Sequence, residues 1–360
     1  MKSIKAEDKD CPKFDFDKYL IPFWEKGNII YNESVFPLEN KEGGDIEIKL
    51  MFTPLKIISV RNAMLTQEYD EGTDWRLENG RLIIPQSSKI ETTEYNYYYP
   101  TGSVSGHVFE KRGGGYVRLF CAPEMHKSQI VVTYIHEDEW DGPIPEKKGN
   151  LLSNFHYKLN NGRTVRIVFF GDSITAGGDS SGSSNSMIAP MVPTWPQLVA
   201  MQLKKEYGDN QIEYINTAVG GTDIVWARES IKERVIDYDP DLVVFGFGMN
   251  NAYREVEEYK RLTQEVIAEI QGAKQDCDIL LVAPMLPNYE AITFCGNQKG
   301  YRGALLELEE EGVVVADITE QYEYLLTRKR FCDITGNNIN HCNDFLARYY
   351  AHTILRTIEK

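Results

Sequence analysis

The sequence predicts two domains, a β-rich domain followed by an α/β domain built on a parallel sheet. The chain has 360 residues, more than one hydrophobic core usually holds. Before about residue 150, short β-prone runs separated by turn residues favour a β-sandwich or jelly roll. After that point, apolar strand-like runs alternate with helical stretches, which is typical of a parallel sheet covered on both faces. We therefore expect domains at 1–150 and 151–360.

The β-rich half is predicted from its alternation of short strands and turns. Glycine-containing turns such as Glu78-Asn79-Gly80 separate the strand-like runs. The segment 141–150 holds Pro143, Pro145 and several charges, so we expect it to be a linker. The expected strands lie at 45–52, 55–60, 80–85, 94–100, 116–123 and 130–136.

The second half is predicted to be α/β because its apolar runs are short and separated by helical periodicity. Within 253–272, apolar residues recur at steps of three and four, which gives one apolar helix face, and a final helix is expected at 344–358. That apolar face consists of Tyr259, Leu262, Val266 and Ile270. The expected strands lie at 164–170, 212–219, 241–248, 278–285 and 312–318.

The charge and the apolar pattern exclude some partners. The formal net charge is −15 and is spread along the chain, so a phosphate backbone would be repelled and nucleic acid is not expected as a partner. No apolar run approaches 18 residues, so no membrane span is expected. Residues 1–20 are charged where a signal peptide would be apolar. We therefore expect a cytoplasmic protein, or a secreted one if a leader segment preceded these residues.

The cysteines predict neither disulfides nor a metal centre. Six cysteines lie far apart without a Cys-x-x-Cys pair, so free thiols in a reducing compartment are expected. The spacing of Cys332, His341 and Cys342 matches no zinc-binding pattern. We expect no metal and no organic cofactor.

A serine stands just past the first strand of the predicted parallel sheet. In VRIVFFGDSITAGG (165–178), Ser173 follows an apolar run and a glycine, before small residues that could open a helix. Ligands of open α/β sheets bind at the carboxyl ends of the strands. A serine there would place its hydroxyl and its backbone amide at the site, helped by the positive end of a helix. The plainer interpretation is an ordinary helix N-cap.

Three further stretches favour the catalytic interpretation, because the topology brings them to the same edge. The segment 216–223 follows the second strand and offers the amides of Gly220 and Gly221. The segment 246–251 follows the third strand and carries Asn250. His341 precedes the final helix. A nucleophile, oxyanion donors and a base are thus predicted to converge.

These four stretches, in this order, resemble the four motif blocks of the SGNH (GDSL-type) hydrolase superfamily. GDSIT matches the first block, NTAVGG the second, GMNN the third and NHCND the last. The resemblance covers roughly residues 150–360. It implies a flavodoxin-like three-layer α/β/α fold and hydrolysis of an ester without a cofactor. Ser173 would be the nucleophile and His341 the base. The oxyanion would be held by the Ser173 and Gly221 amides and by the Asn250 side chain.

The last block departs from the family pattern Asp-x-x-His, because Asn338 stands three residues before His341. Three interpretations are open. The first is a Ser–His dyad whose histidine is held by a backbone carbonyl or by Asn338. The second takes the acid from Asp333 or Asp344. The third is a weakened or inactive site, because an amide stabilises an imidazolium less than a carboxylate does.

The substrate is predicted from a resemblance at the level of domain order. A β-sandwich ahead of an SGNH domain is similar to the arrangement in several bacterial carbohydrate esterases that remove acetyl groups. The Gly- and Ser-rich loop 175–196 would frame the site by mobility or close approach. Trp195 would either line a sugar site or pack in the core, and the tyrosines at 95–99 would form a sugar platform or pack in the sandwich.

We therefore expect a serine esterase that removes short acyl groups, most readily acetyl, from a small-molecule or oligosaccharide ester. Two alternatives remain. One is a lipase or thioesterase acting on longer acyl chains. The other is a non-catalytic sugar-binding protein with a degenerate site.

Overall fold

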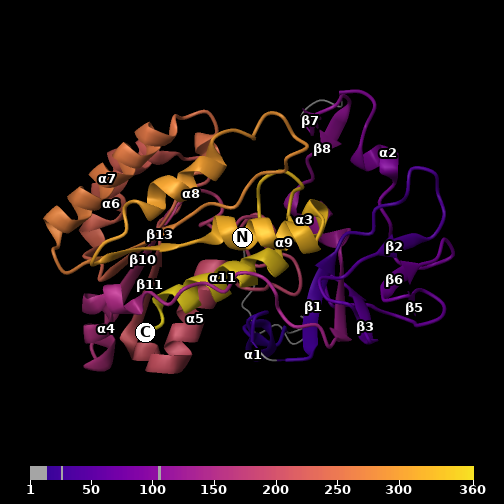
Figure 1. Ribbon diagram of the computed structural model, residues 1–360, viewed down its shortest axis with the longest axis horizontal. Helices are drawn as coiled ribbons and strands as arrows, with labels where there is room; N and C mark the ends of the chain where they lie inside the picture. Colours follow the sequence, from indigo (N-terminus) through magenta and orange to yellow (C-terminus); the bar gives the residue numbers. More distant parts are fainter. Residues whose placement is uncertain (1–13, 26, 104–106) are drawn as a thin grey trace.

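The computed structural model describes residues 14–25, 27–103 and 107–360. Figure 1 shows antiparallel strands at one end of the molecule and, at the other, a sheet with helices on both sides. The predicted order, a β-rich half followed by an α/β half, is confirmed. Cys11 and most of the charged segment 1–20 lie outside the described residues, and the other five cysteines are free thiols.

The antiparallel half contains a four-stranded sheet in the order β1-β9-β3-β4, a three-stranded sheet β2-β6-β5 and a hairpin β7-β8. The inner faces of the two larger sheets contribute to one apolar cluster, which includes Val60, Leu82 and Val132. Strands β1, β4, β5 and β7 were not predicted from the sequence. The strands are β1 (Ile29–Val35), β2 (Ile46–Ile48), β3 (Lys56–Asn62), β4 (Glu68–Tyr69), β5 (Arg76–Glu78), β6 (Arg81–Ile84), β7 (Val108–Glu110), β8 (Tyr116–Arg118) and β9 (Ile130–Ile135).

Three of the predicted strands are wrong in whole or in part, and the run 45–52 is a strand only at Ile46–Ile48. The run 94–100 forms one helical turn, α2 (Tyr95–Tyr98), in which Tyr95 packs against Tyr99 at a ring distance of 5.0 Å. Contacts between side chains four residues apart stabilise a helix, whereas in an extended strand such residues are too far apart to touch. The aromatic run was predicted as a strand because its residues are β-prone. The run 116–123 is a strand only to Arg118, because Pro123 stands at the start of a second helix, α3 (Ala122–Lys127).

The parallel sheet has the strand order β11-β10-β12-β13-β14. Numbered within the domain this order is 2-1-3-4-5, that of flavodoxin-like folds, and the chain reverses direction across the sheet between β10 and β12. Every neighbouring pair is parallel. All five strands were predicted. They are β10 (Val165–Gly171), β11 (Ile212–Asn216), β12 (Leu242–Gly246), β13 (Asp278–Val282) and β14 (Val313–Ala316).

Alternate residues of each strand pack on opposite faces, which produces three layers. In β10, Val168 and Phe170 face a cluster with α6, α7 and α8, whereas Ile167 and Phe169 face α4, α5, α9 and α11. All four apolar residues predicted for the 253–272 helix are buried. The helices are α1 (Phe16–Tyr19), α4 (Ser153–Asn160), α5 (Trp195–Tyr207), α6 (Ile224–Arg234), α7 (Val256–Ala273), α8 (Gln298–Leu306), α9 (Ile318–Arg328), α10 (Phe331–Ile334) and α11 (Asp344–Ile358).

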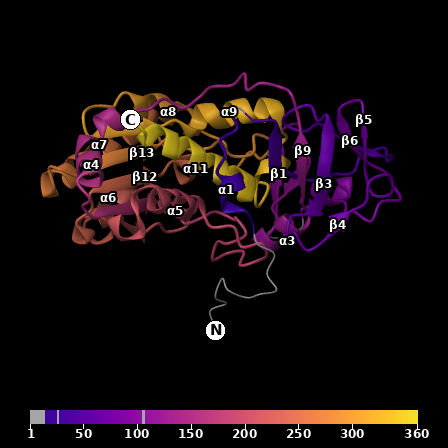
Figure 2. The ribbon, with the colours of Figure 1, turned by 90° about the horizontal axis from the view of Figure 1, so that it is seen from below.

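The two halves are joined by buried polar contacts. Lys329, just after α9, pairs with Glu33 of β1, and both side chains are 0 % exposed. The second carboxylate oxygen of Glu33 accepts a hydrogen bond from the Tyr134 hydroxyl at 2.6 Å. Breaking a fully buried pair leaves an uncompensated charge, which costs about 3–5 kcal/mol. Figure 2 shows α9 and α11 running from the parallel sheet toward β1 and β9.

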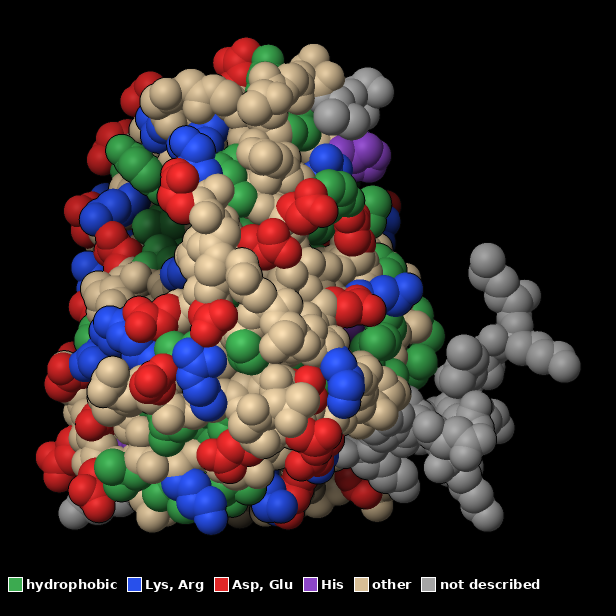
Figure 3. Space-filling model, turned by 90° about the vertical axis from the view of Figure 1, so that its right-hand side faces the viewer, with side chains coloured by type: hydrophobic (Ala, Val, Ile, Leu, Met, Phe, Trp, Pro, Cys, Tyr) green, Lys and Arg blue, Asp and Glu red, His purple; other side chains and the backbone are tan. Residues whose placement is uncertain are grey.

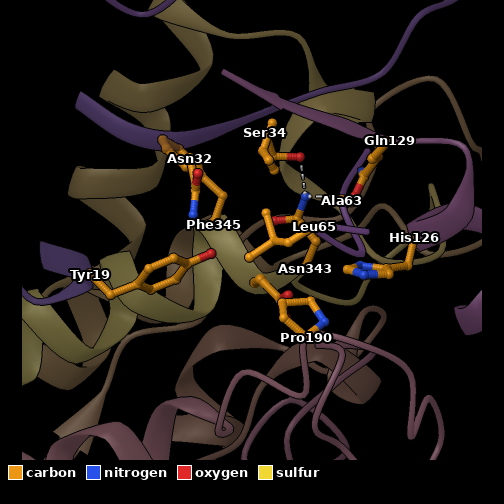
Figure 4. Close-up of a pocket in the computed structure, with 12 residues that line it drawn as sticks. Tyr19, Asn32, Ser34, Ala63, Leu65, His126, Gln129, Pro190, Asn343 and Phe345 are labelled. Atoms are coloured by element: carbon orange, nitrogen blue, oxygen red, sulfur yellow. Dashed lines mark hydrogen bonds between the residues drawn. The ribbon is translucent and has the colours of Figure 1, made fainter. Parts of the chain in front are cut away.

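Little empty space is left where the two halves meet near α11. A cavity of about 10 Å³ remains there, roughly the volume that one water molecule needs. Figure 4 shows its lining, in which the Asn343 side chain donates to the Ser34 hydroxyl at 3.0 Å, with Tyr19, His126 and Pro190 around them. The two halves of the chain are therefore in close contact near α11.

Acidic and basic side chains are interspersed on the outer end of the antiparallel half, and no single charge sign dominates that face (Figure 3). Among the residues that the structure describes, no helix combines the length and the apolar character that a membrane crossing needs.

Candidate active site

The first predicted motif forms a tight turn at the carboxyl end of β10. A Cβ atom on Gly171 would lie 2.2 Å from the Thr175 hydroxyl oxygen and 2.3 Å from the Gly246 carbonyl oxygen, so only glycine fits there. The Asp172 amide donates to the same carbonyl oxygen at 3.1 Å. Ser173 therefore leaves the sheet between β10 and β12, where doubly wound folds bind their ligands.

No regular helix follows Ser173, in contrast to our expectation. Residues 173–178 form successive turns, closed by bonds such as Gly178 N–H to the Ser173 carbonyl oxygen at 2.8 Å. The positive φ angles of Gly177 and Gly178 carry the chain away from a helical path. The first helix after the serine is α5, which begins at Trp195. Any stabilisation of charge at Ser173 must come from individual amides rather than from a helix end.

Ser173, His341 and Asp179 form an unbroken chain of hydrogen bonds. The Ser173 hydroxyl lies 2.8 Å from Nε2 of His341. Nδ1 of the same ring lies 2.7 Å from Oδ2 of Asp179. An ionised carboxylate can only accept, so Nδ1 carries the proton and Nε2 is left to accept from the serine hydroxyl. This is the arrangement of a nucleophile, a base and a group that orients the base.

The acid that orients the histidine is thus neither Asn338 nor Asp333 nor Asp344, and our expectation is corrected. Asn338 has a φ of +68°, and its amide oxygen accepts from the Tyr98 hydroxyl at 2.7 Å. Burial opposes ionisation of Asp333, yet the neighbouring Arg330 guanidinium holds its pKa below the ordinary value. The Asp344 carboxylate accepts from the Ser181 amide at 2.6 Å.

Asp179 is held in place by close backbone packing. Its amide donates to the Cys342 carbonyl oxygen at 3.3 Å, which ties the loop to the residue after His341. A Cβ on Gly178 would lie 2.9 Å from the Cys342 sulfur, and one on Gly336 would lie 2.6 Å from the Asp179 Cβ. The sequence analysis left open whether the glycines and serines of the 175–196 loop serve mobility or close backbone packing. Around Asp179 they serve close packing. The absence of side chains at 178 and 336 lets the acid reach the histidine.

The predicted oxyanion donors lie at the same edge of the sheet. Asn250 is in a 3₁₀ turn after β12, and one of its two amide protons is donated to the Thr222 carbonyl oxygen at 2.8 Å. The second proton of that amide has no acceptor within the part of the chain that the structure describes, so it is available to a ligand. Gly221 has a φ of +78° and is exposed. A Cβ on Gly220 would lie 3.6 Å from the Ser173 Cβ, so the segment 220–221 passes beside the serine.

A second carboxyl group lies beneath the serine. Asp172 is buried and accepts from the Ile174 amide at 2.9 Å. Burial raises the pKa of this carboxyl to about 6, against the opposing effect of the backbone donors and of His341. Its hydrogen bond to Ile174 fixes the turn that presents Ser173.

Trp195 does not line the site. The indole is fully buried, donates its N–H to the Ile174 carbonyl oxygen at 2.8 Å, and packs against Phe169 and Tyr350. Of the two interpretations in the sequence analysis, the core tryptophan is the one that the structure supports. The ring still braces the turn that carries Ser173.

Asp179 was missed because no spacing rule points to it. It lies in a Gly- and Ser-rich run, six residues after the serine, where the sequence suggests only a loop. The one available signal was its position between glycines and small residues, GGDSSG, which permits a tightly packed backbone.

The chain was compared with known proteins. Residues 169–341 match the GDSL-like lipase/acylhydrolase family. A search of curated proteins finds no match. A solved catalytic mutant of an acetylxylan esterase from Geobacillus stearothermophilus is 19 % identical, with a TM-score of 0.45, and the alignment covers 54 % of this chain and 94 % of that chain.

Two further solved structures are similar at the same level. One is a two-domain esterase active on acetylated mannans, 18 % identical over 58 % of this chain and 53 % of that chain, with a TM-score of 0.45. The other is an acetyl xylan esterase, 22 % identical over 53 % of this chain and 98 % of that chain, with a TM-score of 0.43. The match at 169–341 spans three of the four motif blocks completely and ends on the histidine of the last. Residues 169–341 of the α/β half therefore match the GDSL-like lipase/acylhydrolase family, and the chain resembles an SGNH hydrolase.

Proposed function

We propose that the protein is a serine esterase that removes acetyl groups from carbohydrate esters through an acyl-enzyme intermediate. The observation that carries the proposal is the chain of hydrogen bonds from Ser173 through His341 to Asp179, at 2.8 and 2.7 Å. Such a chain supplies a nucleophile, a base and a carboxylate that stabilises the charged base.

In the first half-reaction, His341 takes the proton of the Ser173 hydroxyl while the oxygen attacks the acyl carbonyl carbon. The carbonyl oxygen becomes an oxyanion, held by the amides of Ser173 and Gly221 and by the free N–H of Asn250. Asp179 stabilises the imidazolium. When the tetrahedral intermediate collapses, the carbon–oxygen bond to the alcohol breaks and His341 gives its proton to the leaving sugar hydroxyl.

In the second half-reaction, water replaces the alcohol. His341 takes a proton from water, and the hydroxide attacks the acyl-serine carbonyl. Collapse of this second intermediate breaks the bond to the Ser173 oxygen, which recovers the proton from His341. The products are the carboxylic acid and the free enzyme, and every proton transfer uses the same imidazole.

Two features favour a short acyl group on a carbohydrate. The loop that carries Asp179 is rich in serine and glycine, and its exposed residues include Ser184 and Asn185. A long acyl chain would need an extended apolar groove, which polar residues there do not offer. The presence of a β-rich domain ahead of the SGNH domain resembles the arrangement of bacterial carbohydrate esterases.

The first experiment is release of p-nitrophenol from acetyl, butyryl and octanoyl esters by the wild type and by Ser173→Ala. We expect acetate to be cleaved fastest and the variant to lose at least about 10⁴-fold in kcat, because without the hydroxyl no acyl-enzyme forms. Circular dichroism of the variant checks that it is folded.

The other outcomes of this experiment would contradict the proposal in different ways. A preference for octanoate would favour a lipase or thioesterase. A Ser173→Ala variant as active as the wild type would remove Ser173 from the mechanism. No turnover by the folded wild type would favour a sugar-binding protein with a degenerate site.

A further inference from the structure

Two strongly exposed aromatic side chains lie in the loops after β12 and β13, which we call the rim of the site. Among the residues that the structure describes, the most exposed large hydrophobic side chains are Tyr289, at 75 %, and Tyr253, at 71 %. Tyr253 follows the turn after β12, and Tyr289 lies in the loop after β13. Both therefore lie at the carboxyl edge of the sheet, where Ser173 also lies. Neither is used in the mechanism above.

The loop that carries Tyr289 is fixed by both halves of the chain. The Tyr289 carbonyl oxygen accepts from the Arg112 guanidinium at 2.9 Å, and the Glu290 carbonyl oxygen accepts from the Arg112 amide at 2.9 Å. Lys111 forms an antiparallel bridge with Ala291. The hairpin β7-β8 of the first domain thus extends onto the loop after β13. An exposed ring on so constrained a backbone loses little conformational entropy when it binds a ligand.

One face of the Tyr289 ring is already occupied. The Arg112 guanidinium carbon lies 4.7 Å from the ring centroid. With three-quarters of the side chain still exposed, the opposite face remains open to a ligand. Tyr253 is fixed as well, because its hydroxyl donates to the Thr293 carbonyl oxygen at 2.6 Å.

The loop that carries Tyr289 is hydrogen-bonded to the segment that carries His341. The Asn288 amide donates to the Ile339 carbonyl oxygen at 2.7 Å, so the residue before Tyr289 pairs with the residue two before His341. Two residues span at most about 7 Å. Tyr253 is three residues from the oxyanion donor Asn250, and Asn297 N–H to the Ala252 carbonyl oxygen (2.6 Å) joins the two loops. These contacts tie both loops to the segments that carry His341 and Asn250, so a ligand on these rings would lie at the same edge of the sheet as the serine.

We propose that Tyr289 and Tyr253 form a carbohydrate subsite, in which a pyranose ring next to the acetylated unit packs its C–H face on the tyrosine rings. The proposal rests on the proposed esterase function and names the part of the substrate that the rim binds. Aromatic rings with fixed orientation offer a large apolar area for the C–H face of a sugar, while its hydroxyl groups stay in water. The acetyl ester on the neighbouring unit then lies at Ser173.

The test compares two substrates in Tyr289→Ala and Tyr253→Ala. For an acetylated xylo-oligosaccharide we expect KM to rise about tenfold in each variant while kcat changes less than twofold, since only ground-state binding is lost. For p-nitrophenyl acetate, which has no sugar, kcat/KM stays within twofold of the wild type. Tyr289→Phe keeps the ring and should retain the wild-type KM for the oligosaccharide.

The matched control is Tyr157→Ala. Tyr157 is 56 % exposed and also has an arginine near its ring, Arg163 at 5.5 Å, but it lies on α4, which precedes β10 and so lies toward the opposite end of the sheet. Its substitution should leave KM unchanged for both substrates.

An unchanged oligosaccharide KM in both rim variants would overturn the subsite, and so would equal losses on both substrates, which indicate a disturbed site. Failure of the proposed function has a different signature, namely a wild type inactive on every acetate. In that case calorimetric titration of the unacetylated oligosaccharide into the wild type and Tyr289→Ala still decides the subsite. Affinity that is at least several-fold weaker in the variant supports it, and equal or absent affinity overturns it.

Discussion

The candidate site has an acid side, around Asp179, and an oxyanion side, around Gly221 and Asn250, and the two differ in how deeply they are buried. On the acid side, the Asp179 side chain is 7 % exposed and its backbone packs against Gly336 and Cys342. On the oxyanion side, Gly220 and Gly221 are exposed, and a Cβ on Gly221 would meet no atom within 4 Å. One side belongs to the core of the domain and the other to its surface.

This difference separates two kinds of residue within one mechanism. A change of volume on the acid side disturbs packing that the native state needs, so activity and stability should fall together. A change on the oxyanion side removes an interaction made only with the developing charge, so activity should fall alone. The variants below test this contrast, beginning with the largest effect.

Asp179→Asn should lower kcat for p-nitrophenyl acetate by about 10⁴-fold, because an amide neither stabilises the imidazolium nor fixes the required tautomer. The change is isosteric, so the loss occurs in a folded protein. Steady-state kinetics measure it, and thermal denaturation checks the fold.

Asp333→Asn is the matched control for Asp179→Asn. Asp333 is equally buried but pairs with Arg330 and the Phe36 amide, which belong to the contact between the two halves. We expect it to reduce stability while kcat of the folded fraction stays within about threefold. A full loss of kcat in Asp333→Asn, with Asp179→Asn active, would reverse the assignment of the acid.

Asn250→Ala should lower kcat by about 10²-fold, equivalent to about 3 kcal/mol of barrier, because one oxyanion donor is removed. Asn250 is partly exposed, and among the described residues its side chain bonds only to Thr222, so the free energy of unfolding should change by only about 0.5–1.5 kcal/mol. Urea denaturation measures this. A loss of several kcal/mol would show that the oxyanion side is structural as well and would remove the contrast.

The sequence predicted the parts of the site that follow from strand order. Ser173, Gly221 and Asn250 each stand directly after a predicted strand, and the carboxyl ends of parallel strands share one edge. Asp179 could not be found in this way, because its position depends on non-local packing. The loop can reach His341 because Gly178 and Gly336 have no side chains to block it. No local sequence pattern reveals this packing.

The same distinction holds for the fold. Buried parallel strands such as β10 are recognisable because both faces are apolar over a short run. The run 94–100 was wrongly predicted to be a strand, because its tyrosines are β-prone but fold into a helical turn. In that turn, the Tyr98 hydroxyl donates to the side-chain oxygen of Asn338 in the α/β half. Local preference is a weak guide in such a run, because tertiary contacts also influence the conformation.

The smallest expected effect tests the packing of the acid side directly. Gly336→Ala would place a Cβ 2.6 Å from the Asp179 Cβ and 2.8 Å from the Cys342 carbonyl oxygen. The added methyl group should cost about 1–3 kcal/mol of unfolding free energy. It should also lower kcat by about tenfold, because displacing Asp179 weakens its bond to His341. Urea denaturation and p-nitrophenyl acetate kinetics measure the two effects on one preparation.

Gly303→Ala provides the control, because Gly303 is exposed on α8 and a Cβ there meets no atom within 4 Å. Alanine is the better helix former, so this variant should gain up to about 1 kcal/mol and keep the wild-type kcat. A Gly336→Ala variant that loses stability but keeps full activity would show that Asp179 holds its bond to His341 when the loop is displaced. The acid side would then be rigid only around the carboxylate itself, and the backbone contacts of Gly336 would serve the fold rather than the chemistry.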